Sequence, residues 1–443
     1  MTRRKNSIPA AVRAGAFMLA FLASMSGAVP CAAGTVLSLE DCLELAGAKH
    51  PDMAAAAAAV AASRGRLASA AAGDRMQLSG SVYSTRNYGL QGESTGYSAG
   101  LMASIKLYDA NRSKYSADAS RSMLDAAGED ARGALADVRA NVKTAYLALL
   151  LAYETEHQRE ESVRAFERHL DKAKGFFDAG AKPRYDVTKA EVDLGNAQLS
   201  RAEASAAVRD ARATLANAMG IDPSEDFDVE RAEPDVPQPA SWALDSAETL
   251  AIDNRADRKS SAFMMESGRS ALKAEARAKS PTVSLAGGRA SATDDLSDSE
   301  RFRHEWNIEL KMSIPVYDGG AAKAGVDIAR AQMDSLAASH EKLRQSILLE
   351  VSLAKNNITK AREGIRISRL TVANAEENLK LAEGRYETGV GDAIEVADAI
   401  VSCADARLSE SRARHNLRTA IIDLEKAVGI DFGHDAENDG EKK

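Results

Sequence analysis

Two long segments of this chain repeat each other at a constant offset of 209 residues. The motif IKLYD at 105–109 returns as IPVYD at 314–318, and the triplet GID at 220–222 returns at 429–431. Between these motifs the two copies align without a gap. The chain therefore holds two copies of one structural unit and not two unrelated domains.

Upstream of the first motif the offset falls to 205, since Leu39 and Asp52 pair with Leu244 and Asp257. Four residues are therefore inserted in the second copy, most simply within 291–299. The expected organisation follows from these offsets. It comprises a signal peptide at 1–33, a first repeat at 34–222, a proline-rich linker at 223–243, a second repeat at 244–431 and a polar disordered tail at 432–443.

Each copy is predicted to run helix, two strands, long helix, tight turn, helix, with hairpins at about 76–108 and about 281–316. Apolar residues recur at steps of three and four from Leu343 to Tyr386, which is coiled-coil spacing. A helix over 110–178 would span about 100 Å, far more than a compact domain. Shorter helices, such as one over about 38–75, would stack end to end beside it.

The expected strands alternate between apolar and polar residues. Trp306, Ile308 and Leu310 share one face, whereas Asn307 and Glu309 share the other. Strands of about ten residues suit a tilted membrane-spanning strand. Four strands leave two unpaired edges, which lipid does not tolerate, but three chains would close a barrel around a water-filled lumen. The alternative is a half-buried sheet packed on a soluble core.

The N-terminus has the pattern of an export signal. Basic residues precede an uncharged apolar run at 14–29, and small residues favour cleavage just before Gly34. The alternative is lipidation of Cys31, which Pro30 disfavours because a small residue is needed before a lipidated cysteine.

Several classes of function are disfavoured by the sequence. The net charge of -8 argues against nucleic acid as a partner. The seven histidines show no metal-ligand spacing, and no nucleotide-binding loop or catalytic grouping occurs. No segment after the signal approaches the roughly 20 apolar residues of a membrane helix. We therefore predict no cofactor, no metal and no enzymatic activity.

Three short motifs occur in a set order along the chain. LEDCLELA with the following HPD lies within 39–52, IPVYDGG at 314–320 and GVGDAIEV at 389–396. Each motif is weak alone, but their order within a duplicated unit is specific. From Leu39 to Asp431 the sequence resembles the TolC-like outer membrane efflux protein family.

This resemblance implies a mainly α fold with a small β part, assembled as a homotrimer in the cell outer membrane with a large periplasmic portion. Long antiparallel coiled-coil helices would form a periplasmic α-barrel. Each chain would add four transmembrane strands to a trimeric 12-stranded β-barrel surrounded by outer-membrane lipid. The implied function is the passive exit duct of a tripartite efflux or type I secretion system. Its implied partners are a periplasmic adaptor (membrane fusion) protein and an inner-membrane pump of RND or ABC type.

The resemblance also implies a gate at the periplasmic helical tips. Glu395 and Asp398 fall where the family has two acidic constriction residues, so three protomers would put six carboxylates around one opening and favour cations. Asp186, the repeat counterpart of Glu395, and Tyr386 fall on the acidic and aromatic members of a link between helices. For any single carboxylate the alternative is a solvated helix face.

The basic member of that link is replaced by Gly391, so this lock departs from the family pattern. Arg184 and Lys189 are candidate replacements. Gly180, Gly389 and Gly391 mark the tips that are expected to dock the adaptor. Alternatively these glycines only end helices, and the two roles are compatible.

The competing prediction is a periplasmic or surface coiled-coil structural protein without a pore. A duct should fractionate with the outer membrane, require detergent and run as a trimer, whereas a structural coiled coil should be soluble in a periplasmic extract. A wide tunnel is not a recognition pocket, so the sequence identifies neither the exported drug, metal or protein nor the pump class.

Overall fold

The computed structural model describes residues 36–89, 92–232, 244–296, 298 and 301–432. The expected signal peptide at 1–33, including Cys31, lies outside the described residues. So do 233–243 of the expected linker and 433–443 of the expected tail.

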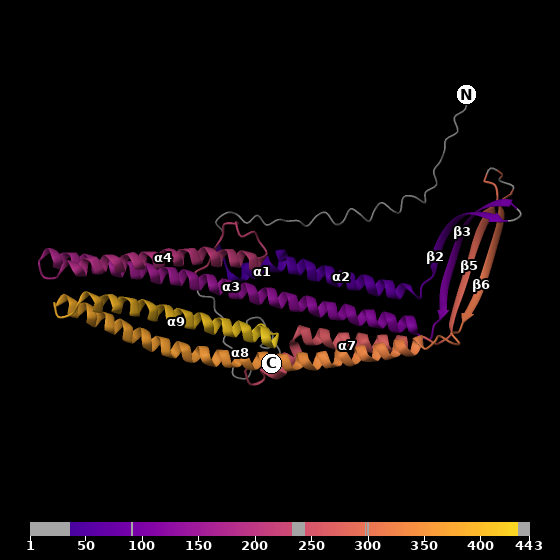
Figure 1. Ribbon diagram of the computed structural model, residues 1–443. Coiled ribbons are helices and arrows are strands. Elements are labelled where there is room, and N and C mark those ends of the chain that lie inside the picture. Colours follow the sequence, from indigo (N-terminus) through magenta and orange to yellow (C-terminus); the bar gives the residue numbers. More distant parts are fainter. Residues whose placement is uncertain (1–35, 90–91, 233–243, 297, 299–300, 433–443) are drawn as a thin grey trace, which may run out of the picture.

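Two long helices run along most of the length of the molecule (Figure 1). They are α3, Arg112–Asp178, and α8, Ala321–Glu387, each of 67 residues. Each turns back into a helix of 36 residues, α4 at Arg184–Met219 and α9 at Ala393–Val428. All four helices begin and end at the offset of 209 seen in the sequence. Within the described residues, no helix has an apolar stretch long enough to cross a bilayer.

The short N-terminal helix of each repeat is divided in two. The first repeat has α1, Leu39–Lys49, and α2, Pro51–Ala72. The second has α6, Ala247–Asn254, and α7, Ala256–Glu275. The prediction of one helix over about 38–75 is therefore wrong, because Pro51 has no N–H for a continuous helix and holds the preceding residue extended.

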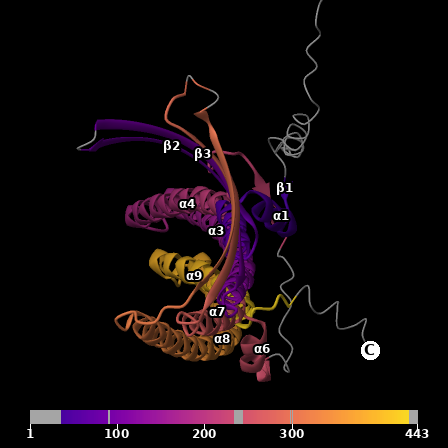
Figure 2. The same cartoon turned by 90° about the vertical axis from the view of Figure 1, so that its right-hand side faces the viewer.

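The helices lie side by side in a curved layer (Figure 2). Near the tips α3 and α9 lie between α4 and α8, and nearer the sheet α3 and α7 lie between α2 and α8. The short helices of each repeat are thus stacked along the long ones. In both halves of the layer, α8 is one edge and α4 or α2 is the other.

A four-stranded antiparallel sheet joins the two repeats. Its strands are, in spatial order, β2 at Gln77–Gly89, β3 at Gly92–Tyr108, β5 at Thr282–Thr293 and β6 at Arg303–Ser313. A separate two-stranded parallel sheet pairs β1, Val36–Leu37, with β4, Asp228–Val229. Strand β6 stops short of the apolar Val316 because Pro315 cannot donate to a strand ladder.

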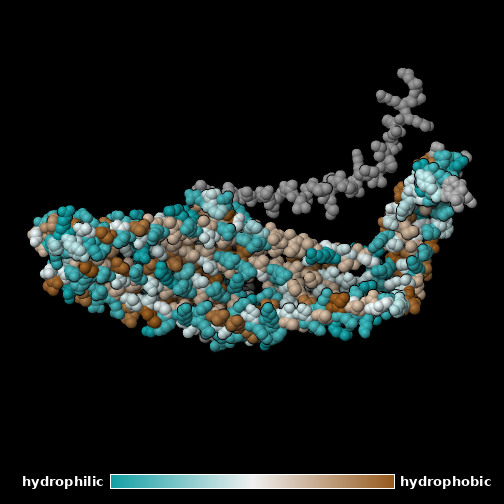
Figure 3. Space-filling view, in the orientation of Figure 1, coloured by the Kyte–Doolittle hydropathy of each residue, from teal (hydrophilic) through white to brown (hydrophobic). Residues whose placement is uncertain are grey.

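The register of the sheet aligns the predicted apolar faces. Leu78 pairs with Ala103, Ala103 with Gly287, and Gly287 with Ile308, so one apolar row crosses all four strands. Every residue of β6 is exposed, and apolar side chains gather along the strands (Figure 3). Leu310, for example, is 67% exposed. The alternative of a sheet packed on a soluble core within one chain is therefore contradicted.

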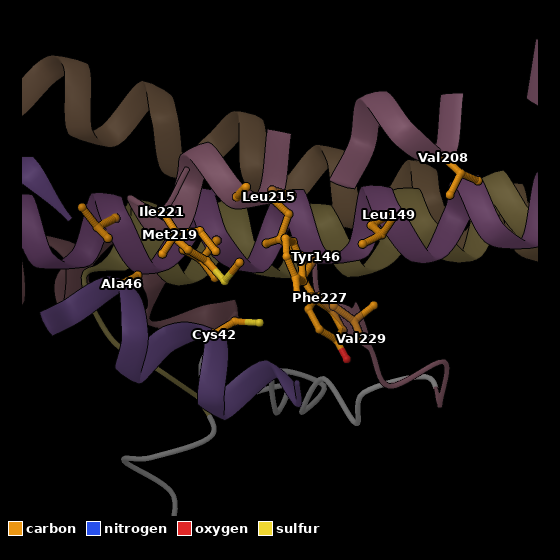
Figure 4. Close-up of a cluster of buried hydrophobic side chains, with 14 residues drawn as sticks. Cys42, Ala46, Tyr146, Leu149, Val208, Leu215, Met219, Ile221, Phe227 and Val229 are labelled. Atoms are coloured by element: carbon orange, nitrogen blue, oxygen red, sulfur yellow. The ribbon is translucent and has the colours of Figure 1, made fainter. Parts of the chain in front are cut away.

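The buried core is also duplicated. The first cluster packs α1, α3 and α4 on β1 and β4 (Figure 4). Tyr146 also donates a hydrogen bond to the carbonyl of Glu230 at 3.0 Å. Most residues of the second cluster occupy equivalent positions of the second repeat. Corresponding buried pairs are Val138 and Ile347, Val142 and Val351, Leu149 and Ile358, Leu215 and Leu424, and Cys42 and Ala247. The predicted mainly α architecture with a small β part is confirmed.

Candidate functional site at the helical tips

Both helical tips are closed by the same turn. Gly180 has φ +71° and Gly389 has φ +78°, a left-handed conformation that glycine adopts without strain. The Gly180 N–H donates to the carbonyl of Phe177 at 2.9 Å, and the Gly389 N–H donates to that of Tyr386 at 3.1 Å. These glycines therefore end their helices, which was one of the two roles predicted for them.

Tyr386 lies at the centre of a cluster that joins the two tips. Its side chain is 1% exposed, and its ring lies 5.4 Å from the rings of both His169 and Phe176. Lys182, from the first tip, places its ammonium nitrogen 5.2 Å from the centre of the Tyr386 ring. The second repeat thus inserts an aromatic residue between groups of the first.

Asp186 is buried in the first turn of α4, with only 8% of its surface exposed. Burial and the charge of Asp186 raise the pKa of Tyr386, so the phenol stays neutral. Burial lowers the pKa of His169, and this effect outweighs the opposing attraction of Asp193 and Asp186. The structure therefore brings Asp186 and Tyr386 into one buried electrostatic environment.

Glu395 and Asp398 lie on the first turns of α9. Asp392 caps this helix by accepting a hydrogen bond from the Glu395 N–H at 2.8 Å. The Glu395 carboxylate also lies 3.3 Å from the Arg385 guanidinium of α8. Asp398 is exposed and borders a groove between α3, α4 and α9. Glu395 is thus partly neutralised within its own tip, whereas Asp398 faces the groove.

The basic group that contacts the Gly391 turn is not one of the two that the sequence suggested. Lys189 forms its ion pair with Asp193 on its own helix, and Arg184 is exposed at the start of α4. The group that reaches Gly391 is the Lys182 ammonium, which donates to its carbonyl oxygen at 2.9 Å. Within one chain the contact to Gly391 is thus made by Lys182, and a role for Arg184 or Lys189 in the link stays a prediction.

The matches to known proteins cover both repeats. The family model described as outer membrane efflux protein matches residues 42–221 and 249–430. The chain belongs to the outer membrane efflux protein family. The resemblance seen in the sequence is confirmed, and the protein is an outer-membrane protein.

Curated relatives from this efflux family are similar over part of their length. Outer membrane protein TolC of Escherichia coli is 24% identical over 302 residues, which are 65% of this chain and 60% of TolC. Outer membrane protein OprJ of Pseudomonas aeruginosa is 26% identical over 72% of this chain and 66% of OprJ. Protein CyaE of Bordetella pertussis is 27% identical over 73% of this chain and 69% of CyaE. The chain thus matches between three fifths and seven tenths of these relatives.

Solved structures share the fold of this efflux-family chain. The outer membrane protein VceC of Vibrio cholerae has a TM-score of 0.77 at 17% identity, covering 89% of this chain and 96% of VceC. The CmeC outer membrane channel of Campylobacter jejuni has a TM-score of 0.76 at 18% identity, covering 91% of this chain and 88% of CmeC. At these identities the likeness concerns the fold alone.

Two members of the tip cluster were not predicted from the sequence. Lys182 is the counterpart of Gly391 at the offset of 209, so the duplication could have drawn attention to it. His169 carries no such signal, since it looks like a solvated residue among the charges of a long helix. Within the described part of the chain, no three histidine, cysteine, aspartate or glutamate residues are grouped to hold a metal ion.

Proposed function

We propose that this chain is one protomer of a homotrimeric outer-membrane exit duct. The sheet would span the membrane and the helical layer would form a tunnel in the periplasm. The observation that carries this proposal is the four-stranded sheet, which exposes one apolar face and leaves an edge open on both β2 and β6. Three copies would supply twelve strands and satisfy every edge, as lipid requires.

The edges of the helical layer support closure with further copies of the chain. On α4 the side chains that face α3 recur at Ala190 and Ala197, and Leu199 lies two residues on, pointing away from α3 and exposed. On α8, Leu370 is likewise exposed two residues beyond the buried Ser368. The two opposite edges of one layer thus carry apolar side chains that a neighbouring copy would cover.

The gate is proposed at the narrow end of this tunnel. In a trimer, Glu395 and Asp398 would contribute six carboxylates around the opening, and Asp186 and Tyr386 would lie at the buried contact between neighbouring helices. Both Asp186 and Glu395 also occupy the third position of a helix, where the helix N-terminus stabilises a carboxylate whatever its other role. The gate role therefore needs a direct test.

We further propose that the tips dock a periplasmic adaptor fed by an inner-membrane pump of RND or ABC type. Gly180, Gly389 and Gly391 shape the two turns that such an adaptor would contact. The names of relatives support a pump partner, among them the toluene efflux pump outer membrane protein TtgC of Pseudomonas putida, 21% identical over 56% of its length. In this scheme the chain performs no chemistry and supplies a passive path.

The proposal is tested by fractionation, mass and conductance. The protein should partition with the outer membrane, require detergent, appear as a trimer in native mass spectrometry and give cation-preferring conductance in a planar bilayer. A protein that is monomeric and soluble in a periplasmic extract would contradict the proposal. That result would favour the non-pore coiled-coil alternative.

A further inference from the structure

The two tips of one chain are joined by a contact between repeat-equivalent positions. Residues 182 and 391 are related by the offset of 209, and the Lys182 ammonium donates to the Gly391 carbonyl at 2.9 Å. The contact therefore links the turn between α3 and α4 to the turn between α8 and α9. A charged donor makes this a stronger bond than one between neutral groups.

Both ends of this contact are held by their own turns. The Lys182 N–H donates to the carbonyl of Phe176 at 3.3 Å, and the Gly391 N–H donates to that of Arg385 at 2.9 Å. The side chain of Lys182 is half-buried, and its ammonium also lies over the Tyr386 ring. Because donor and acceptor stand on short hydrogen-bonded turns, forming the bond orders little additional backbone.

Gly391 is suited to accept through its backbone and not to carry a link of its own. A Cβ at this position would lie 3.1 Å from backbone atoms of Arg385 and Tyr386, closer than ordinary contact. A side chain at 391 would therefore push the turn away from α8. The positive charge is instead supplied from the equivalent position of the other repeat.

Other links between the two repeats near the tips are more exposed. Lys172 on α3 pairs with Glu387 on α8 at 2.5 Å, but both side chains are about half exposed. Arg159 lies 3.5 Å from Asp405 on α9, and that carboxylate is exposed as well. Exposed pairs contribute little to stability, so these links cannot replace the Lys182 contact.

We propose that Lys182 is the latch that holds the two helical tips of a protomer together, and that it sets how readily the tip end of the duct opens. This inference rests on the proposed function. Lys182 acts as a positioning residue, because it touches the Gly391 turn and the Tyr386 ring and not the exported substrate.

The test compares K182M and K182R with R184M in the full-length protein in detergent. Arg184 is exposed on the same tip, so R184M removes an equal charge without removing the contact. Hydrogen exchange at the amides of both turns, near 176–182 and 385–391, should be about tenfold faster in K182M. Exchange in K182R and R184M should stay near that of the unsubstituted protein. Equal exchange in K182M and R184M would overturn the latch.

Conductance in planar bilayers separates this inference from the proposed function. If the unsubstituted protein conducts, K182M should open more often than it does, whereas R184M should match it. A conducting protein whose opening is unchanged by K182M would overturn the latch and leave the duct intact. If the unsubstituted protein and K182M both fail to conduct, the proposed function fails, and the exchange rates still decide whether Lys182 joins the tips.

Discussion

At the scale of single residues, the tip cluster contains buried polar groups whose burial costs free energy. Within the described residues, neither ring nitrogen of His169 has a hydrogen-bond partner. The buried hydroxyl of Tyr386 has none either. An unsatisfied buried group costs about 1–3 kcal/mol, so these two residues weaken the seam between the tips. The contact between the two tips therefore depends on side-chain packing and on specific contacts such as that of Lys182.

The buried imidazole predicts that acid loosens the tips. Burial lowers the pKa of His169 below its ordinary value of 6.5, with Lys172 acting in the same direction and Asp193, Asp186 and Glu383 opposing it. As the pH falls below 6.5, the solvated imidazole of an opened tip is protonated at a higher pH than the buried imidazole of a closed tip. Stability of the closed tip is thus complete above that pH and is lost as the pH falls toward the lowered value.

The measurement is hydrogen exchange at the tips of the unsubstituted protein and of H169F between pH 7.5 and 5.5, corrected for intrinsic exchange rates. Exchange should rise on acidification in the former and change little in H169F, which has no group to protonate. A similar pH response in both proteins would show that His169 is not responsible.

The acidic residues of α9 predict the ion preference of the duct. Replacing Glu395 and Asp398 with alanine should reduce cation preference and block by multivalent cations in a planar bilayer, because fixed charges at a constriction focus the potential. D405A is a suitable control, since Asp405 is an exposed carboxylate further along the same helix. Unchanged selectivity would leave both acids as solvated members of the helix.

How far the site could be predicted depends on what each residue contacts. Glu395, Asp398 and Tyr386 could be proposed from the resemblance because they lie in or beside the motif at 389–396, and their gate role stays a prediction. Lys182 was missed because its partner is a backbone carbonyl, which leaves no trace in the identity of the residue that carries it. His169 was missed because burial at one point of a long helix depends on which helices pack there.

At the scale of elements, the two offsets predicted most of the architecture. The long helices of the two repeats begin and end 209 residues apart, and the short helices α2 and α7 begin 205 apart, at Pro51 and Ala256. The division into α6 and α7 could not be predicted in the same way. It occurs at Arg255, where no proline marks it, and the guanidinium there is held by Asp257 and Glu350.

The end of α4 predicts a strong effect of one small substitution. Gly220 has φ +72°, and a Cβ there would lie 2.6 Å from the Cα of His50, between α1 and α2. Alanine would be strained by about 1–2 kcal/mol from φ alone, and the clash adds to this. G220A should therefore lower the melting temperature of the purified protein by several degrees.

The matched control is G195A in the middle of the same helix. A Cβ at Gly195 meets no atom within 4 Å, so alanine should be neutral or stabilise the helix by about 0.5–1 kcal/mol. Thermal unfolding followed by circular dichroism measures both variants. Similar melting temperatures would mean that the junction with His50 can yield.

The sheet predicts that its two faces tolerate charge differently. Leu310 belongs to the apolar face and Glu309 to the opposite one. An arginine on a lipid-facing strand position costs about 2–4 kcal/mol near the bilayer centre. L310R should therefore reduce the amount of assembled protein in the outer membrane, while E309R should not. Equal loss in both variants would contradict the assignment of the faces.

At the scale of the whole molecule, the edge helices predict how copies meet. Leu199 on α4 and Leu370 on α8 each lie 19 residues from the glycine of their own tip, about 28 Å along the helix. Both side chains are exposed at opposite edges of the layer. In a closed ring, α4 of one copy would meet α8 of the next at this height.

Cysteines at 199 and 370 should therefore form disulfides between copies and yield a covalent trimer on denaturing gels. The control pairs L199C with L381C, which lies on the same face of α8 but about 16 Å nearer the tip. The native Cys42 and Cys403 are buried and should not interfere. Cross-linking of the control pair, or none in either pair, would contradict this arrangement.

The pairing of β3 with β5 has a consequence for how the protein is made. It joins Tyr97 to Thr293, whereas each hairpin and each pair of tip helices closes over a much shorter stretch of chain. Closing a longer loop costs more entropy, and distant strand pairing is slow. We expect the two repeats to form their helices separately, and the pairing of β3 with β5 to form last. A newly exported chain would then cross the periplasm with its apolar strands still unpaired, and it would need a chaperone until it reaches the bilayer.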